Sequence, residues 1–312
     1  MSTKVKGEMA LYPRSEGQEF PGDHGRLHER LARGLLLADG AIGTMLHAKG
    51  LQAGEPPELW NVTRPRVVQG VHKAYLAVGC DLVETNTFGA NHLRLKESRL
   101  AEQTAAINLR AVQLARKVCT AGHLVAGAVG PTGRFSKGKG TASVTEIVSA
   151  FKEQVSHLIQ GGVDLILVET MTHLAEARMA LQATRECPPV PVAVSLVFSE
   201  QRGGLCTLDG ASPQEAVREL SAAQVVGCNC MDAERMAEVL RAMREATSLP
   251  LIAQPHAGLP ESRGKKWVYP LDPEAMVRHI PVLLASNPGI LGGCCGTTPA
   301  HLEAVVRSLR HP

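Results

Sequence analysis

The sequence has few aromatic residues, no long apolar run and little net charge. Aromatic side chains make up 3% of its 312 residues, and 33 Lys and Arg against 30 Asp and Glu leave a formal charge of +3. The basic residues are scattered, so no surface for nucleic acid is predicted. No apolar run reaches the roughly 18 to 20 residues that span a bilayer, and residues 1–34 lack the apolar core of a secretory signal. We therefore expect a cytoplasmic protein that binds neither nucleic acid nor membrane.

Eight cysteines without a sign of secretion are expected to be reduced thiols. The pattern lacks the paired Cys-x-x-Cys knuckles of structural zinc sites. Four cysteines are interpreted as small packing residues: Cys80, Cys119, Cys187 and Cys206. The remaining four lie in two short motifs near the C-terminal end, and these motifs carry the chemical interpretation.

Short, continuously apolar runs alternate with longer amphipathic segments eight times. Such runs are typical of strands in a parallel sheet that is covered by helices. The predicted strands are residues 35–41, 81–87, 124–129, 164–170, 190–198, 224–230, 249–255 and 289–294. The predicted helices are residues 65–78, 101–118, 144–161, 173–185, 213–222, 232–246, 273–285 and 299–310.

Eight such units predict an α/β fold, a single (β/α)8 TIM barrel over residues 35–312. Residues 1–34 are expected to form an N-terminal tail with a short helix at residues 26–33. The alternative, an open doubly wound sheet, needs a phosphate-binding glycine pattern after its first strand. The DGAIG sequence at residues 39–43 does not match that pattern.

Two cysteine motifs lie at the ends of predicted strands six and eight, which lie close together around such a barrel. Residues 227–230 read GCNC, and residues 292–299 read GGCCGTTP. Thiolates are preferred ligands of zinc, and three protein ligands leave one position open for substrate. A thiol that binds there would lose its proton, which suits alkyl transfer to sulfur. The residues alone do not decide between Cys228 and Cys230 as the third ligand.

Four motifs in order resemble the homocysteine S-methyltransferase family. They are DGAIGTM at residues 39–45, ETNTFGAN at 84–91, GCNC at 227–230 and GGCCGTTP at 292–299. That family includes the homocysteine module of cobalamin-dependent methionine synthase and the betaine-homocysteine methyltransferases. The resemblance implies a zinc enzyme that methylates homocysteine to methionine, with a zinc thiolate as the nucleophile.

The resemblance also implies roles for individual residues. It assigns the Zn²⁺ to Cys230, Cys294 and Cys295. It places the amino-acid end of homocysteine against Asp39, Gly40, Thr85, Asn86, Thr87 and Glu169. Two carboxylates are suited to pair with an ammonium group and so fix the thiol over the metal. His256 stands where the family commonly has asparagine, and we expect it to be a supporting or solvent-facing residue instead of a fourth ligand.

The methyl donor stays open at this point. An onium donor of the betaine type would be held by aromatic faces at the barrel mouth. The aromatic candidates are Trp60, Phe88, Phe135, Trp267 and Tyr269. One barrel is expected to use up the chain, so methylcobalamin or methyltetrahydrofolate would have to arrive on a separate protein. Two other hypotheses are a methyltransferase for another thiol or selenol, and a subunit that binds homocysteine and zinc for a corrinoid partner.

Overall fold

Eight parallel strands form a closed barrel in the computed structural model, which describes residues 25–135, 142–201, 203–263 and 266–310. Their order around the barrel is β1-β12-β9-β8-β5-β4-β3-β2, and a parallel bridge between Ala38 and Leu82 joins the first strand to the last. The strands are β1 (Leu36–Leu37), β2 (Leu82–Glu84), β3 (Leu124–Val129), β4 (Leu165–Met171), β5 (Val192–Leu196), β8 (Val225–Asn229), β9 (Leu251–Gln254) and β12 (Ile290–Leu291). The predicted TIM barrel is confirmed.

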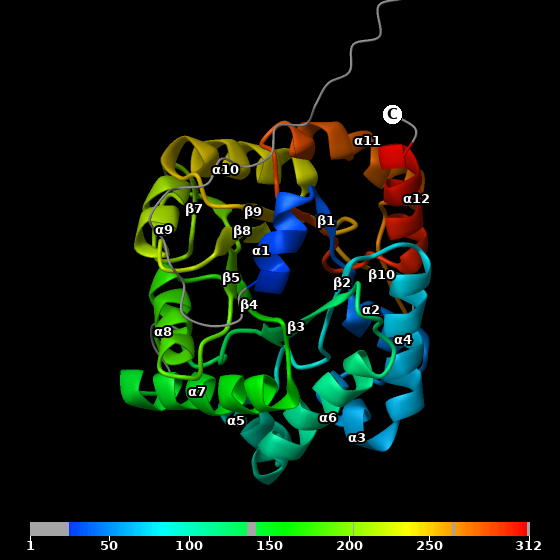
Figure 1. The fold of residues 1–312 in the computed structure, drawn as a ribbon, viewed down its shortest axis with the longest axis vertical. Helices are drawn as coiled ribbons and strands as arrows, with labels where there is room; N and C mark the ends of the chain where they lie inside the picture. The colour runs from blue at the N-terminus through cyan, green and yellow to red at the C-terminus, as the bar shows by residue number, and fades with distance from the viewer. Residues whose placement is uncertain (1–24, 136–141, 202, 264–265, 311–312) are drawn as a thin grey trace, which may run out of the picture.

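Helices surround the strands on the outside (Figure 1). They are α4 (Pro65–Ala77), α6 (Thr104–Arg116), α7 (Val144–Gly161), α8 (Leu174–Arg185), α9 (Pro213–Glu219), α10 (Ala233–Ala246), α11 (Pro273–Leu284) and α12 (Pro299–Arg310). Local chemistry fixes where several of them begin. Ser143 and Ser212 each form a capping box with the glutamate three residues later, which satisfies backbone N–H groups of the first turn.

Helix α1 (Gly25–Ala32) closes the end of the barrel where the strands begin, and it lies over the centre of the strands in Figure 1. Its Leu27 and Leu31 are buried in one apolar cluster to which each of the eight barrel strands contributes at least one residue. Arg26 and Arg30 pair with Asp164 and Asp81 beside the first residues of β4 and β2. A functional site is therefore left to the opposite end.

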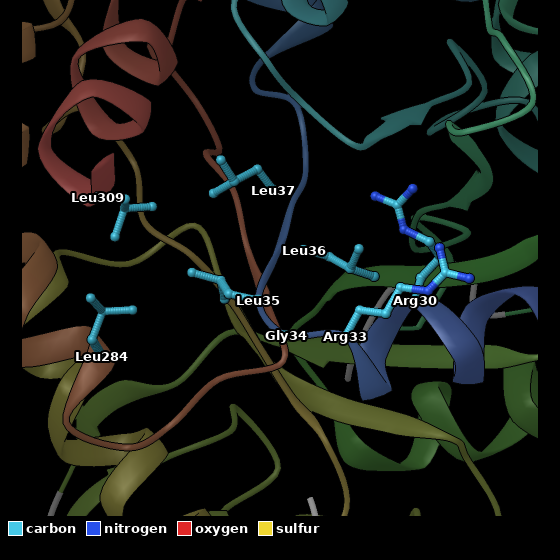
Figure 2. A pocket seen from close by; sticks show the side chains of 8 residues that line it. All are labelled: Arg30, Arg33, Gly34, Leu35, Leu36, Leu37, Leu284 and Leu309. Carbon is cyan, nitrogen blue, oxygen red and sulfur yellow. The ribbon is translucent and has the colours of Figure 1, made fainter. Parts of the chain in front are cut away.

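A cavity of about 480 Å³ lies beside helix α1 (Figure 2). Arg33 of the segment after α1 borders it, and Leu284 and Leu309 enter it from α11 and α12. The cavity adjoins the start of β1, so it lies away from the strand ends where the predicted site residues stand.

Additional short elements follow the strands and were absent from the sequence interpretation. They are α2 (Ile42–Ala48), η1 (Pro57–Leu59), α3 (Trp60–Thr63), α5 (His92–Leu95) and η2 (Lys96–Ser98). The first three residues of the helix predicted at residues 101–118 form a separate 3-10 helix, η3 (Ala101–Gln103), before α6. Two antiparallel hairpins follow β5 and β9: β6 (Ser199–Gln201) with β7 (Gly204–Cys206), and β10 (Glu261–Arg263) with β11 (Lys266–Val268).

The predicted strands are mostly longer than the observed ones. Residues 35–41 and 289–294 were predicted as strands, but β1 and β12 pair over two residues each. Beyond those residues the backbone turns into loops that carry the polar side chains. Within the described residues, no helix combines the length and the apolar character needed to cross a membrane.

Candidate metal and substrate site

Three cysteine thiols meet at the end of the barrel where the strands finish. Cys230 directly follows β8, and Cys294 and Cys295 follow β12, with β9 paired between those two strands. The three sulfur atoms lie within 4.8 Å of one another, and the Cys230 and Cys295 sulfurs are 3.5 Å apart. Cys228, the alternative in the sequence, is instead fully buried in the core.

The glycine and threonine residues around the cysteine pair explain the local backbone. A Cβ atom on Gly293 would lie 2.3 Å from the Thr297 hydroxyl oxygen, so a side chain there would clash. That hydroxyl donates to the Cys294 carbonyl at 2.6 Å and closes the turn. The Cys294 N–H donates to the Pro255 carbonyl, and the Ala257 N–H donates to the Cys295 carbonyl. Both hydrogen bonds join this turn to the loop after β9. The motif thus holds two neighbouring thiols in fixed positions.

The thiols perturb one another strongly. Hydrogen bonds from the Cys230 and Cys294 thiols lower the pKa of Cys295 well below its usual range. The pKa of Cys294 is raised by its thiol neighbours and by burial. One sulfur in the group is therefore a thiolate at neutral pH, which is the form that binds a soft cation. Three clustered sulfur donors, one of them ionised, fit a thiophilic metal with an open coordination position.

Three buried carboxylates lie at the same end of the barrel: Asp39 after β1, Glu84 at the end of β2 and Glu169 in β4. The Glu84 N–H donates to both carboxylate oxygens of Asp39 at 3.2 Å. Burial raises the pKa of each carboxyl, and their mutual repulsion raises the pKa of Asp39 and Glu169 further. The ion pairs of the described residues all lie elsewhere. A cation is what this cluster is suited to bind.

Glu84 and Gln254 belong to this cluster, although the sequence interpretation did not select them. The Gln254 side-chain N–H donates to a Glu84 carboxylate oxygen at 2.6 Å across the barrel. Its buried side-chain oxygen has no hydrogen-bond partner among the described residues. The signal for Glu84 was available, since it is the first residue of the ETNTFGAN motif at residues 84–91. Gln254 offered no such signal, because its role depends on which strands face each other.

Replacing Glu84 with glutamine is expected to stabilise the metal-free, substrate-free protein above pH 7. Burial raises the Glu84 pKa from 4.5 to about 7, so folding becomes less favourable as the pH rises from 4.5 to 7. The glutamine avoids that ionisation and still accepts from Gln254. We expect the free energy of unfolding to rise by on the order of 3 kcal/mol at pH 8 and by less than about 1 kcal/mol at pH 5. Urea unfolding at both pH values measures this, and an equal change at the two would contradict the charge explanation.

The other residues assigned to substrate binding have their side chains engaged within the protein. The Thr85 and Thr87 hydroxyls are 2.6 Å apart, and Thr87 also donates to the Ala128 carbonyl. The Asn86 side chain donates to the Pro57 carbonyl at 2.8 Å. A Cβ atom on Gly40 would lie 2.5 Å from the Thr297 hydroxyl oxygen. These residues shape the loops beside the thiols, and their contact with substrate stays a prediction.

His256 lies outside the close group of three sulfurs. Its Nδ1 accepts the Gly258 N–H at 3.0 Å. The histidine lies near enough to Cys295 to contribute to its lowered pKa, after the hydrogen bonds from Cys230 and Cys294. The histidine is therefore a neighbour of the thiols with one ring nitrogen already engaged.

The predicted ring of aromatic residues at the barrel mouth is wrong for Trp60. That side chain is fully buried, and its ring N–H donates to Glu55 at 2.7 Å. The Phe135 ring packs edge-on against His173 at 5.0 Å. Tyr269 does lie beside the thiols, since a Cβ atom on Gly296 would meet its ring at 2.3 Å. The side chain of Trp267 is outside the described part of the chain.

Comparison with known proteins identifies the family of the chain. The family model for homocysteine S-methyltransferase matches residues 36–309. Methionine synthase of Mycobacterium leprae (strain TN) is 31% identical over 304 residues, and that of Mycobacterium tuberculosis is 30% identical over 306 residues. These matches cover 91% and 90% of the chain but 25% of each methionine synthase, so the chain spans about a quarter of those relatives.

The solved structures include a full-length match. The metallated form of the homocysteine methyltransferase MmuM from Escherichia coli superimposes with a TM-score of 0.76 and 25% identity. That match covers 91% of this chain and 99% of the MmuM chain. A methyltransferase from Methanosarcina mazei, at 11% identity and a TM-score of 0.57, shares the fold. From the family match and these relatives, the chain belongs to the homocysteine S-methyltransferase family.

Proposed function

We propose that this protein transfers a methyl group to the sulfur of homocysteine and so forms methionine. Cys230, Cys294 and Cys295 would hold a Zn²⁺ ion. The proposal rests on one observation above all, a group of three thiols within 4.8 Å beside three buried carboxylates. Homocysteine carries a thiol and an ammonium group, which match the two halves of this site. The existence of a metallated form of the homocysteine methyltransferase MmuM supports a metal in this protein.

The residues of the chain would divide the work between the two ends of the substrate. Asp39, Glu84 and Glu169 would pair with the ammonium group, whose charge relieves the repulsion among the buried carboxylates. Binding the amino-acid end in this way directs the substrate thiol toward the cysteine group. Zn²⁺ bound there supplies a Lewis acid that favours the thiolate form of the substrate at neutral pH. The sulfur then forms the new S–CH₃ bond, while the donor leaves with the electrons of its bond to that methyl group.

Two classes of donor fit this site. An onium compound of the betaine type could approach the thiols beside the Tyr269 ring, where a cation meets an aromatic face. Alternatively, methylcobalamin or methyltetrahydrofolate is supplied by a separate protein or module. The second candidate, a barrel that depends on such a carrier, is favoured by the match to a quarter of each methionine synthase.

A panel of donors tests the proposed function. Zinc-loaded protein and homocysteine are mixed separately with glycine betaine, S-methylmethionine, S-adenosylmethionine, methylcobalamin and methyltetrahydrofolate, and methionine is measured. Methionine from one onium donor supports a self-sufficient enzyme, whereas zinc-loaded protein that binds homocysteine but forms no methionine with any onium donor supports the carrier-dependent barrel. Zinc-loaded protein that neither binds homocysteine nor forms methionine with any donor would contradict both. A parallel test with other thiols and with selenohomocysteine compares acceptors.

A further inference from the structure

Asn229 occupies the junction between the thiols and the carboxylates. It is the last residue of β8 and is fully buried. Its side-chain oxygen accepts from the Thr170 N–H and from the Ser195 hydroxyl, both at 2.9 Å. Its side-chain N–H₂ group lies 2.7 Å from the Thr170 hydroxyl oxygen and 3.6 Å from the Cys294 sulfur. One carboxamide thus connects strands β4, β5 and β8 with the cysteine pair.

Thr170 has a backbone conformation that its side chain disfavours. Its φ of 56° is in the left-handed region, where a β-branched residue is a genuine outlier. Such a residue persists only when its surroundings hold it there. Two hydrogen bonds join it to Asn229: the Thr170 N–H donates to the Asn229 side-chain oxygen, and the Asn229 side-chain N–H donates to the Thr170 hydroxyl. The distortion lies within β4, where the register shifts between Val168 and Met171.

This strained residue directly follows Glu169 in the chain. The orientation of Glu169 therefore depends on the backbone that Asn229 holds. The same carboxamide also approaches the sulfur of Cys294 with an N–H donor, and this contact restrains the position of the sulfur. Asn229 also directly precedes Cys230, whose own φ is 56°.

We propose that Asn229 is a positioning residue that sets two features of the site at once. Through Thr170 it fixes the Glu169 carboxylate toward the substrate ammonium group, and through its N–H it supports the Cys294 sulfur as a metal ligand. The inference rests on the proposed function for its substrate half. Its metal half depends only on the thiols of this chain.

The two roles can be separated by combining Asn229→Ala with Thr170→Gly. Glycine adopts a φ of 56° without strain, so it no longer needs the asparagine to hold the backbone. We expect Asn229→Ala to weaken Co²⁺ binding by 10- to 100-fold, as losses of partners of metal ligands typically do. We also expect it to raise the KM for homocysteine by about 10-fold. The double variant should recover most of the KM and none of the Co²⁺ affinity.

Cobalt is the probe because sulfur-to-cobalt absorption reports the ligands directly and needs no substrate. Asn108→Ala is the matched control, since Asn108 is equally buried but bonds to the Ala90 and Thr104 carbonyls on the outer side of the barrel. It should leave both the cobalt spectrum and the KM unchanged. Thermal melting shows which variants are folded. If Asn229→Ala does not fold, Asn229→Ser takes its place, because a serine side chain is too short to reach both Thr170 and Cys294.

The outcomes distinguish this proposal from the function on which it partly rests. Wild-type cobalt affinity in folded Asn229→Ala or Asn229→Ser would overturn the metal half. A raised KM that Thr170→Gly does not lower would overturn the substrate half. If the wild type bound Co²⁺ but never formed methionine, the proposed function would fail, and the cobalt comparison would still decide the role of Asn229.

Discussion

Cys295→Ala is expected to bind no zinc and to lose methyl transfer by on the order of 10³-fold or more. Without one of its sulfur ligands the site no longer holds the metal. The Lewis acidity of the metal stabilises the transition state by several kcal/mol, and each 1.36 kcal/mol corresponds to a factor of ten in rate. Cys295 is also the exposed residue of the three, and hydrogen bonds from its two thiol neighbours lower its pKa. Metal analysis of the purified variant and its rate of methionine formation measure the two effects, and Cys294→Ala should behave in the same way.

Cys228→Ala is the matched control for that experiment. Cys228 lies in β8, two residues before Cys230, but packs in the core away from the three thiols. Its loss should lower stability through a small cavity and leave the zinc content unchanged. An active Cys294→Ala, Cys295→Ala double variant without metal would refute the proposed role of the thiols.

Glu169→Gln is expected to change the choice of acceptor. Removing one anionic partner of a buried substrate ammonium group costs about 3 to 5 kcal/mol, which corresponds to a loss of about 10² to 5 × 10³ in kcat/KM for homocysteine. An acceptor that lacks the amino group, 4-mercaptobutyrate, should lose far less. The ratio of kcat/KM for the two acceptors is the measurement, because it removes any general loss of activity.

Glu176→Gln serves as the control for the carboxylate. Glu176 is equally buried and accepts from the Thr132 N–H and hydroxyl, on a helix outside the barrel. It should lose stability and keep the wild-type acceptor ratio. If Glu169→Gln also kept that ratio, Glu169 would not contact the amino group.

Most of the fold was predictable because the strands are apolar throughout and the helices carry clear boundaries. The predicted limits of β3, α7 and α12 agree with the structure residue for residue. The short elements after β1 and the two hairpins were missed, because each is too short to give a periodic pattern. Their position depends on contacts with the barrel, as the packing of Trp60 in a separate apolar cluster shows.

The thiol group was predictable to the extent that its motifs follow strands that lie close together. The choice of Cys230 over Cys228 came from the family resemblance, and the structure gives its physical counterpart in the burial of Cys228. The partners across the barrel were not predictable, because the Gln254–Glu84 bond joins residues 170 positions apart. Asn229 lies within a motif that was selected for its cysteines, and nothing in one sequence indicates that its side chain reaches Thr170.

The order of the strands around the barrel sets the order in which the thiols can meet during synthesis. Cys230 and Cys295 are 65 residues apart, and β12 enters between β1 and β9 only after every other barrel strand has been made. Until β12 has paired, the nascent protein has only Cys230 in place, and one sulfur does not form a site that holds an ion tightly. The bound ion would then stabilise the closed barrel only after β12 has paired. When the ion is released, the two-residue pairings of β12 with β1 and with β9 should therefore open before the other strand pairings.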